Sequence, residues 1–117
     1  ELEGVICFND AHEYLNPELE KFFTDPWKIE RPAHGENIAD ILKRTRDFWE
    51  EKIHDVSLQD KTILIASHGC AVRALLQNVY QDPQNFWHGC VPPNCSVNVI
   101  EVTDGKAVFL EEDKVYA

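Results

Sequence analysis

The sequence has few basic residues, no long apolar run and few cysteines, and each scarcity excludes a class of protein. There are 11 Lys and Arg against 21 Asp and Glu in 117 residues, so the formal net charge is -10. This balance argues against a nucleic-acid-binding protein, which needs a basic patch. The longest apolar run, Thr62 to Ala66, is far too short to cross a bilayer. We therefore expect neither a nucleic-acid partner nor a membrane partner.

No secretion signal and no regular cysteine pattern is visible in these 117 residues. No basic stretch is followed by an apolar stretch of the kind that directs export. The cysteines lie at irregular spacing, at Cys7, Cys70, Cys90 and Cys95, so a disulfide framework is not expected. We expect thiols that stay reduced and a cytoplasmic location.

The remaining composition fits one small globular domain. Hydrophobic residues make up 44% of the chain, which is too many for a disordered tail and enough for a modest core. We therefore expect residues 1–117 to form a single domain. The acidic net charge does not exclude a phosphate site, because net charge governs solubility and long-range steering rather than the field inside a pocket.

Two helices are predicted in the first half of the chain. Asn16-Pro17-Glu18 favours a helix start, since Asn caps well and Pro suits the first helical position. The helix should end near residue 24, because Asp25 precedes a proline and is pushed out of the helical region. In residues 36–54 apolar side chains recur at helical spacing, with charged ones on the other face, which predicts an amphipathic helix.

The second half predicts a strand, a helix and a hairpin. Residues 62–67 are continuously apolar up to Ser67, which is typical of a strand buried on both faces. A helix is predicted over 70–81. Residues 96–102 and 107–110 flank an Asp104-Gly105 turn and predict an antiparallel β-hairpin. This order indicates an α/β fold, with a sheet, flanking helices and a C-terminal hairpin. The chain supplies few neighbours for a doubly buried strand, so we expect an incomplete sheet.

His68 and Gly69 stand where the predicted strand ends and the next helix begins. In open α/β sheets ligands bind beyond the carboxyl ends of the strands. The first N–H groups of a helix lack intrahelical partners and favour an anion, together with the helix dipole. Gly69 allows a ligand to approach the backbone closely. This pattern favours a phosphate site, and a helix-capping or buried hydrogen-bonding histidine is the alternative.

Four motifs, in order, resemble those of one known family across essentially the whole chain. They are Leu2-Glu3-Gly4, Gly35-Glu36-Asn37-Ile38-Ala39-Asp40 through Arg44, Ile63-Leu64-Ile65-Ala66-Ser67-His68-Gly69 with Arg73, and Pro93-Asn94-Cys95-Ser96-Val97. Together they resemble the second half of the histidine phosphatase superfamily, the phosphoglycerate mutase-like proteins. The resemblance implies a partial histidine phosphatase fold.

The resemblance also implies a reaction, phosphoryl transfer through a phosphohistidine on a small phosphorylated substrate, with no metal or other cofactor. In this family a first His, within an Arg-His-Gly motif, attacks phosphorus. Two arginines and a second His bind the phosphoryl oxygens, and a Glu or Asp protonates the leaving oxygen. The physics agrees, because such transfer depends mostly on positioning and on stabilising charge at the equatorial oxygens.

Matched by position, His68 corresponds to the second catalytic histidine of the family. Gly69 and Cys70 correspond to backbone positions that contact substrate, and Asn94 would lie at the pocket rim. Cys70 stands where phosphoglycerate mutases often have Asn, which argues against a true mutase. Glu36 and Arg44 are expected to hold helix and loop together rather than to act in catalysis. Segment 7–34, with Trp27, corresponds to a variable insert or lid.

One departure from the family outweighs any substitution. The chain contains no Arg-His-Gly triplet, and its other His-Gly pairs, at His34 and His88, follow no buried strand. We therefore expect the C-terminal part of a phosphomonoester phosphatase, truncated and inactive alone because the nucleophile supplies most of the rate.

Two other functions remain open on the sequence, as does the oligomeric state. A non-catalytic anion-binding or interaction domain, a pseudo-phosphatase, could keep the site at His68. A small metal-binding domain is disfavoured, because Cys90 and Cys95 are the only closely spaced cysteine pair and no second pair has zinc-ligand spacing. A homodimer is compatible with the pattern, since pairing between chains would protect an exposed strand edge.

Overall fold

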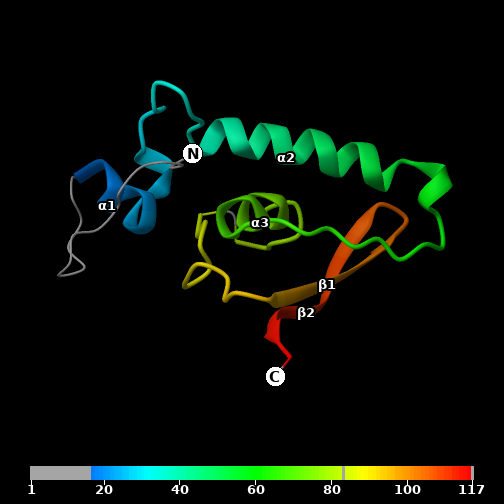
Figure 1. Cartoon of the computed structure of the whole chain (residues 1–117). Coiled ribbons are helices and arrows are strands. Elements are labelled where there is room, and N and C mark those ends of the chain that lie inside the picture. Colours follow the sequence, from blue (N-terminus) through cyan, green and yellow to red (C-terminus); the bar gives the residue numbers. More distant parts are fainter. Residues whose placement is uncertain (1–16, 83, 117) are drawn as a thin grey trace. The chain divides into compact units, whose positions relative to one another are not determined.

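The computed structural model describes residues 17–82 and 84–116. The chain divides into two compact units, Glu1–Ile41 and Leu42–Ala117. Figure 1 labels the helices and strands in chain order. The Leu2-Glu3-Gly4 motif, Cys7 and residues 7–16 of the expected lid lie outside the described residues.

In the first unit, α1 (Pro17–Thr24) is followed by a short 3₁₀ helix, η1 (Pro26–Lys28). The predicted helix over 17–24 is confirmed. The backbone N–H of Asp25 donates to the Lys21 carbonyl at 2.8 Å, and η1 then begins at a buried Pro26. Leu19 and Phe22 of α1 are buried. The apolar spacing of this short sequence therefore gives one buried helix face.

Helix α2 (Ile38–Ile53) begins at the end of the first unit and confirms the helix predicted over 36–54. Its start is fixed by a reciprocal pair of hydrogen bonds, in which Asp40 N–H donates to Asn37 Oδ1 and Asn37 N–H donates to Asp40 Oδ2, both at 3.0 Å. Arg31 also pairs with the Asp40 carboxylate. The Asn37 N–H and the Arg31 guanidinium hold the pKa of Asp40 below its usual value. This is a capping box with its acidic residue in the first turn.

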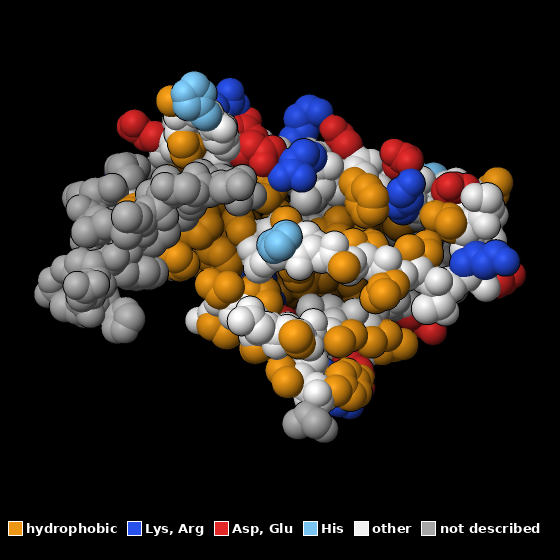
Figure 2. Space-filling model, in the orientation of Figure 1, with side chains coloured by type: hydrophobic (Ala, Val, Ile, Leu, Met, Phe, Trp, Pro, Cys, Tyr) orange, Lys and Arg blue, Asp and Glu red, His pale blue; other side chains and the backbone are white. Residues whose placement is uncertain are grey.

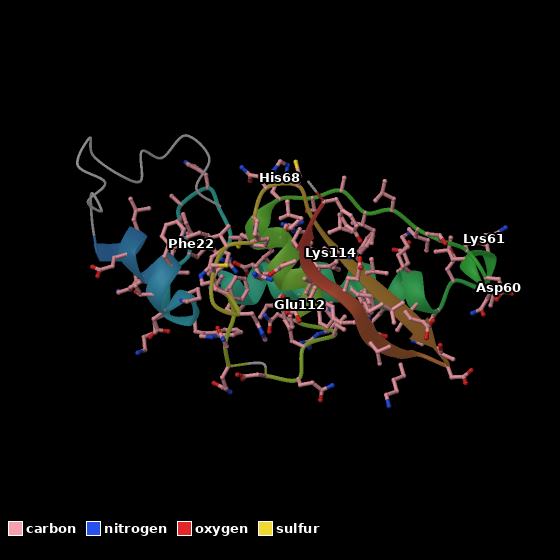
Figure 3. The ribbon with its side chains drawn as sticks, turned by 90° about the horizontal axis from the view of Figure 1, so that it is seen from below. Phe22, Asp60, Lys61, His68, Glu112 and Lys114 are labelled. Carbon is pink, nitrogen blue, oxygen red and sulfur yellow. The ribbon has the colours of Figure 1, made fainter. Side chains whose placement is uncertain are left out.

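The prediction of a doubly buried strand over 62–67 is wrong for the described residues. After η2 (Val56–Leu58) the chain runs from Asp60 and Lys61 to His68 as an extended segment without strand pairing (Figures 1 and 3). Its side chains are exposed, with 92% of Leu64 accessible. The sheet of the described part has two strands, β1 and β2, so no strand pairs with this segment there. An apolar run becomes a buried strand only where other strands accept its hydrogen bonds.

Helix α3 (Gly69–Leu76) follows this segment directly, as predicted, but it ends before residue 81. The helix tightens at its end, where Asn78 N–H donates to Leu75 O at 3.3 Å and Val79 N–H to Leu76 O at 2.8 Å. The Asn78 side chain also donates to Leu75 O at 2.8 Å, which competes with regular helix continuation.

The predicted hairpin is confirmed as β1 (Ser96–Thr103) and β2 (Lys106–Val115), which pair antiparallel. Asp104 and Gly105 both have positive φ, 51° and 77°, as a two-residue hairpin turn requires. The register shifts between Val97 and Val99 and again before Ile100, so the hairpin contains bulges. Asp113, with φ of 47°, lies within the first irregularity.

The second unit buries a small core and leaves many apolar side chains at its surface. The buried apolar residues of this unit include Ala74, Leu76, Val79, Phe86 and Trp87. Figure 2 shows how much hydrophobic surface is exposed on the face it displays. Large apolar side chains of the hairpin and of the extended segment are among the exposed ones, including Val108, Leu110 and Leu64. Within the described residues, no helix has the length and hydrophobicity to cross a membrane.

We predict that Asn37→Ala lowers the free energy of unfolding by about 1 kcal/mol, the usual cost of losing a capping side chain. The change removes the oxygen that accepts the Asp40 N–H. Urea unfolding followed by circular dichroism measures it. Asn37→Asp keeps an acceptor at this position and should restore most of the loss. Equal stability of Asn37→Ala and the unchanged protein would contradict the capping role.

Candidate functional site

His68 lies at the N-cap of α3, where the extended segment ends (Figure 3). Its backbone is extended, with φ of -115° and ψ of 159°, and its imidazole makes no capping hydrogen bond. The side chain is exposed. The His68 side chain therefore does not cap the helix in this structure. Its ring is accessible to a ligand.

The start of α3 presents backbone donors beside this ring. The His68 carbonyl accepts the first hydrogen bond of the helix, from Val72 N–H at 2.8 Å. The N–H groups of the first turn, beginning with Gly69, have no acceptor within the helix. They carry the positive end of the helix dipole. An imidazole and a helix N-terminus at adjacent residues form an arrangement that suits an oxyanion.

A loop lies directly against the first residue of α3. A methyl group added at Gly69 would stand 2.9 Å from Val91 Cγ1 and 3.6 Å from Pro92 Cδ. Glycine at this position therefore allows a close approach of the loop that precedes β1. The contact brings together the first residue of α3 and a loop that follows this helix in the chain, just before β1.

The other predicted site residues belong to several elements, and not all of them to the unit that holds this contact. Cys70 is half-buried in the first turn of α3, and Asn94 is exposed in the turn that leads into β1, close in sequence to Val91. Glu36 is half-buried just before α2, in the first unit, and Arg44 is exposed on α2, in the second. The predicted contribution of Glu36 and Arg44 to holding helix and loop stays a prediction. In the part of the chain that the structure describes, Arg31 of the preceding loop pairs with Asp40 of α2.

The sequence analysis missed the role of Arg73, which is fully buried in α3 with 0% of its surface accessible. Its guanidinium donates to Cys90 O from Nε at 3.2 Å and from Nη2 at 2.8 Å. Nη1 donates to the Tyr80 hydroxyl at 2.7 Å, and Nη2 also lies 2.7 Å from Asp113 Oδ2. One signal was present, because Arg73 and Tyr80 are seven residues apart and would share a face of the helix predicted over 70–81.

The partners of Arg73 keep its charge inside the fold. Burial opposes the charge, but the hydrogen bonds to Asp113 and Tyr80 outweigh it and raise the pKa of Arg73. Burial also raises the pKa of the Tyr80 hydroxyl, and the neighbouring Arg73 cation offsets only part of that rise. The Asp113 backbone N–H donates to Asn98 Oδ1 at 2.9 Å, which fixes the bulge that carries the carboxylate.

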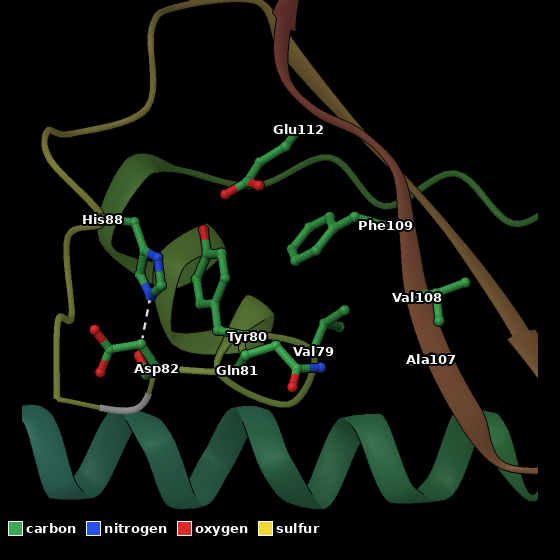
Figure 4. A pocket seen from close by; sticks show the side chains of 9 residues that line it. All are labelled: Val79, Tyr80, Gln81, Asp82, His88, Ala107, Val108, Phe109 and Glu112. Atoms are coloured by element: carbon green, nitrogen blue, oxygen red, sulfur yellow. Dashed lines mark hydrogen bonds between the residues drawn. The ribbon is translucent and has the colours of Figure 1, made fainter.

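A second feature is a pocket of about 390 Å³ beside the hairpin (Figure 4). The rings of Tyr80 and His88 stack in it, with centroids 3.5 Å apart, and Phe109 of β2 lies 5.3 Å from Tyr80. His88 also contacts the Asp82 carbonyl at 3.2 Å. None of the predicted site residues lines this pocket, so it is separate from the start of α3.

The thiols and other metal-ligand types do not gather into a metal site in the described residues. Cys70, Cys90 and Cys95 form no disulfide bond in the described residues. Among residues 17–82 and 84–116, no group of three or more His, Cys, Asp and Glu side chains is placed to hold a metal ion. The small metal-binding domain left open by the sequence would draw on the four cysteines and some of the histidines, and Cys7 and His12 among these lie outside the described part.

We predict that Gly69→Ala lowers the free energy of unfolding by about 1 kcal/mol, since the added methyl overpacks against Val91. Without that contact, alanine would be the better helix residue. The matched test repeats Gly69→Ala in a Val91→Ala background, where the obstructing Cγ1 is gone and the change should be neutral or stabilising. The same effect in both backgrounds, measured by urea unfolding, would show that the loop does not lie on Gly69.

Comparison with known proteins agrees with the motifs. The family described as "Histidine phosphatase superfamily (branch 1)" matches residues 4–113. A 2,3-bisphosphoglycerate-dependent phosphoglycerate mutase of Neisseria gonorrhoeae is 40% identical over 86 residues, which is 66% of this chain and 38% of the relative. The protein of the same name from Neisseria meningitidis is 40% identical over 88 residues, with the same coverage.

A further relative, the 2,3-bisphosphoglycerate-dependent phosphoglycerate mutase of Enterococcus faecalis, is 38% identical over 45 residues, 38% of this chain and 20% of that protein. No solved structure matches the chain. The chain thus spans 38% of the length of its Neisseria relatives. The described helices and hairpin are consistent with part of a histidine phosphatase fold. Since the family match covers nearly the whole chain, this protein belongs to the histidine phosphatase superfamily.

Proposed function

We propose that these residues belong to a phosphomonoester phosphatase that works through a phosphohistidine, and that His68 is its second catalytic histidine. In this proposal His68 binds the oxygens of the phosphoryl group during transfer. The group is attacked by another histidine, which the 117 residues do not provide within an Arg-His-Gly motif. The family membership of the chain supports the reaction type.

The observation that carries this proposal is the placement of His68. The imidazole is exposed, makes no capping bond and directly precedes the first-turn N–H groups of α3. A protonated imidazole donates a charge-assisted hydrogen bond, which is short and strong. The helix N–H groups add donors that are already oriented. Together they stabilise the negative charge that phosphoryl transfer spreads over the equatorial oxygens.

The proposal also specifies the phosphoryl acceptor, which is water in a phosphatase. The relatives named above are phosphoglycerate mutases, so phosphoryl transfer to a second hydroxyl is the competing outcome. Cys70 stands where such mutases often have Asn, and a thiol offers a weaker hydrogen-bonding group than an amide at that position. This difference favours water as the acceptor. The substrate proposed is a small phosphorylated molecule in the cytoplasm.

We further propose that segment 7–34 acts as a lid that selects the substrate. Within its described part, Trp27 lies in η1 and is 41% exposed. An exposed indole offers a large apolar surface to a bound molecule at low entropic cost.

We predict that the chain binds inorganic phosphate at the start of α3. Amide resonances of Gly69 and Ala71 should shift on titration with phosphate. His68→Gln should weaken the affinity about tenfold, the size of one hydrogen bond involving a charged group. His54→Gln is the control, because it removes another exposed imidazole without touching α3. Equal weakening by both variants would show a general charge effect and no site at His68.

A non-catalytic interaction domain is the second candidate, and the exposed apolar side chains of Ile63, Leu64 and Ile65 favour it. Such a surface next to an anion site suits a domain that binds a partner. Both candidates predict phosphate binding, so binding does not separate them. The two candidates are separated by a test for acid-labile phosphohistidine in the complete gene product, because a pseudo-phosphatase forms none.

We predict no steady hydrolysis of p-nitrophenyl phosphate by the 117-residue chain, since loss of a nucleophile removes most of the rate. The absorbance of released p-nitrophenol measures this. His68→Ala is the control, because any rate that survives in this variant comes from a contaminating phosphatase. A steady rate that His68→Ala abolishes would show that the chain supplies its own nucleophile.

A further inference from the structure

Arg73 connects α3 to segments far from it in the chain. Its partners are 7 residues away at Tyr80, 17 residues away at Cys90 and 40 residues away at Asp113. The guanidinium is inaccessible to solvent, and Asp113 is largely covered. A planar group with five donors can bond a carbonyl, a hydroxyl and a carboxylate at once, which a lysine ammonium cannot do in the same geometry.

This cluster is better suited to fixing geometry than to adding stability. A buried ion pair gains little overall, because desolvation of both charges offsets their attraction. It does, however, penalise any arrangement in which one partner moves away, since that leaves a buried charge without compensation. The position of the Cys90 carbonyl relative to α3 is therefore tightly determined.

The position of Cys90 in turn determines the neighbour of Gly69. Arg73 lies one turn after the start of α3 and holds the Cys90 carbonyl by two hydrogen bonds. The next residue, Val91, contacts Gly69 so closely that a methyl group on Gly69 would be 2.9 Å from its Cγ1. The same helix thus carries the candidate anion site at its first turn and the group that holds the loop against it.

We propose that Arg73 is a positioning residue for the phosphate site, because it holds the Cys90–Pro92 loop against Gly69 and so sets the space in which a phosphate meets the first-turn N–H groups. The inference rests on the proposed function for the site itself. Arg73 does not touch phosphate in this account. It acts through the Cys90 carbonyl and Val91.

The test compares two variants that weaken the same cluster in different places. Arg73→Lys keeps the charge but loses the paired hydrogen bonds to Cys90 O, so the loop is released. Tyr80→Phe removes the hydroxyl that accepts from Nη1 and leaves the bonds to Cys90 and Asp113. Both should destabilise the protein. Only Arg73→Lys should weaken phosphate binding, by about tenfold, with Tyr80→Phe within about twofold of the unchanged chain.

The readouts are the phosphate affinity from the Gly69 amide and the nuclear Overhauser effect between Val91 methyl and Gly69 Hα protons in the phosphate-free protein. The proposal expects Arg73→Lys to lose this effect and Tyr80→Phe to keep it. If both variants lower phosphate affinity in proportion to their loss of stability, Arg73 is merely structural and the proposal is overturned.

Two further outcomes separate this inference from the proposed function. If the unchanged chain does not bind phosphate, the proposed function of the site is wrong. If instead Arg73→Lys retains the nuclear Overhauser effect between Val91 and Gly69, Arg73 does not hold the loop and the positioning role is overturned. Should Arg73→Lys fail to fold, Asp113→Asn replaces it. That variant keeps the shape of the side chain, removes the charge opposite Nη2 and should weaken the same effect and the phosphate affinity in parallel.

Discussion

The charge of the Arg73 guanidinium, buried in the second unit, constrains everything packed around it. A cation without access to water must find acceptors inside the protein, and removing one partner of such a pair costs about 3–5 kcal/mol. The acceptors come from the turn after α3, from the loop before β1 and from β2. The fold of this unit is therefore the one that brings these three segments to one helix face.

The hairpin and the candidate site are linked through this constraint. The bulge opposite Asn98 places Asp113 in a left-handed conformation, and bulges commonly re-aim a side chain in this way. The carboxylate so presented holds Arg73, which holds the Cys90 carbonyl beside the start of α3. A strand irregularity far along the chain thus has a physical connection to the loop that contacts Gly69.

The extended segment before His68 is exposed, in contrast to the buried Arg73 cluster. Ile63, Leu64 and Ile65 are 49%, 92% and 44% exposed, and no described strand pairs with their backbone. Exposed apolar residues with unpaired backbone groups favour association with another chain segment. Because His68 directly follows this segment, whatever covers it also restricts where the imidazole lies. Burial of these three side chains and the positioning of the His68 imidazole are therefore coupled.

The sequence by itself determined the local elements, the family and the position of His68. Caps, prolines and apolar spacing act over a few residues, so they predicted α1, α2 and the hairpin, and the motif around His68 placed it before a helix. The tertiary structure decided what depends on distant partners. The sequence predicted a buried strand over residues 62–67, yet burial needs neighbouring strands that the described residues do not supply. In the sequence Arg73 was only part of the motif that follows His68. The fold shows that Tyr80, Cys90 and Asp113 surround it, because sequence spacing carries no information about contacts across 17 and 40 residues.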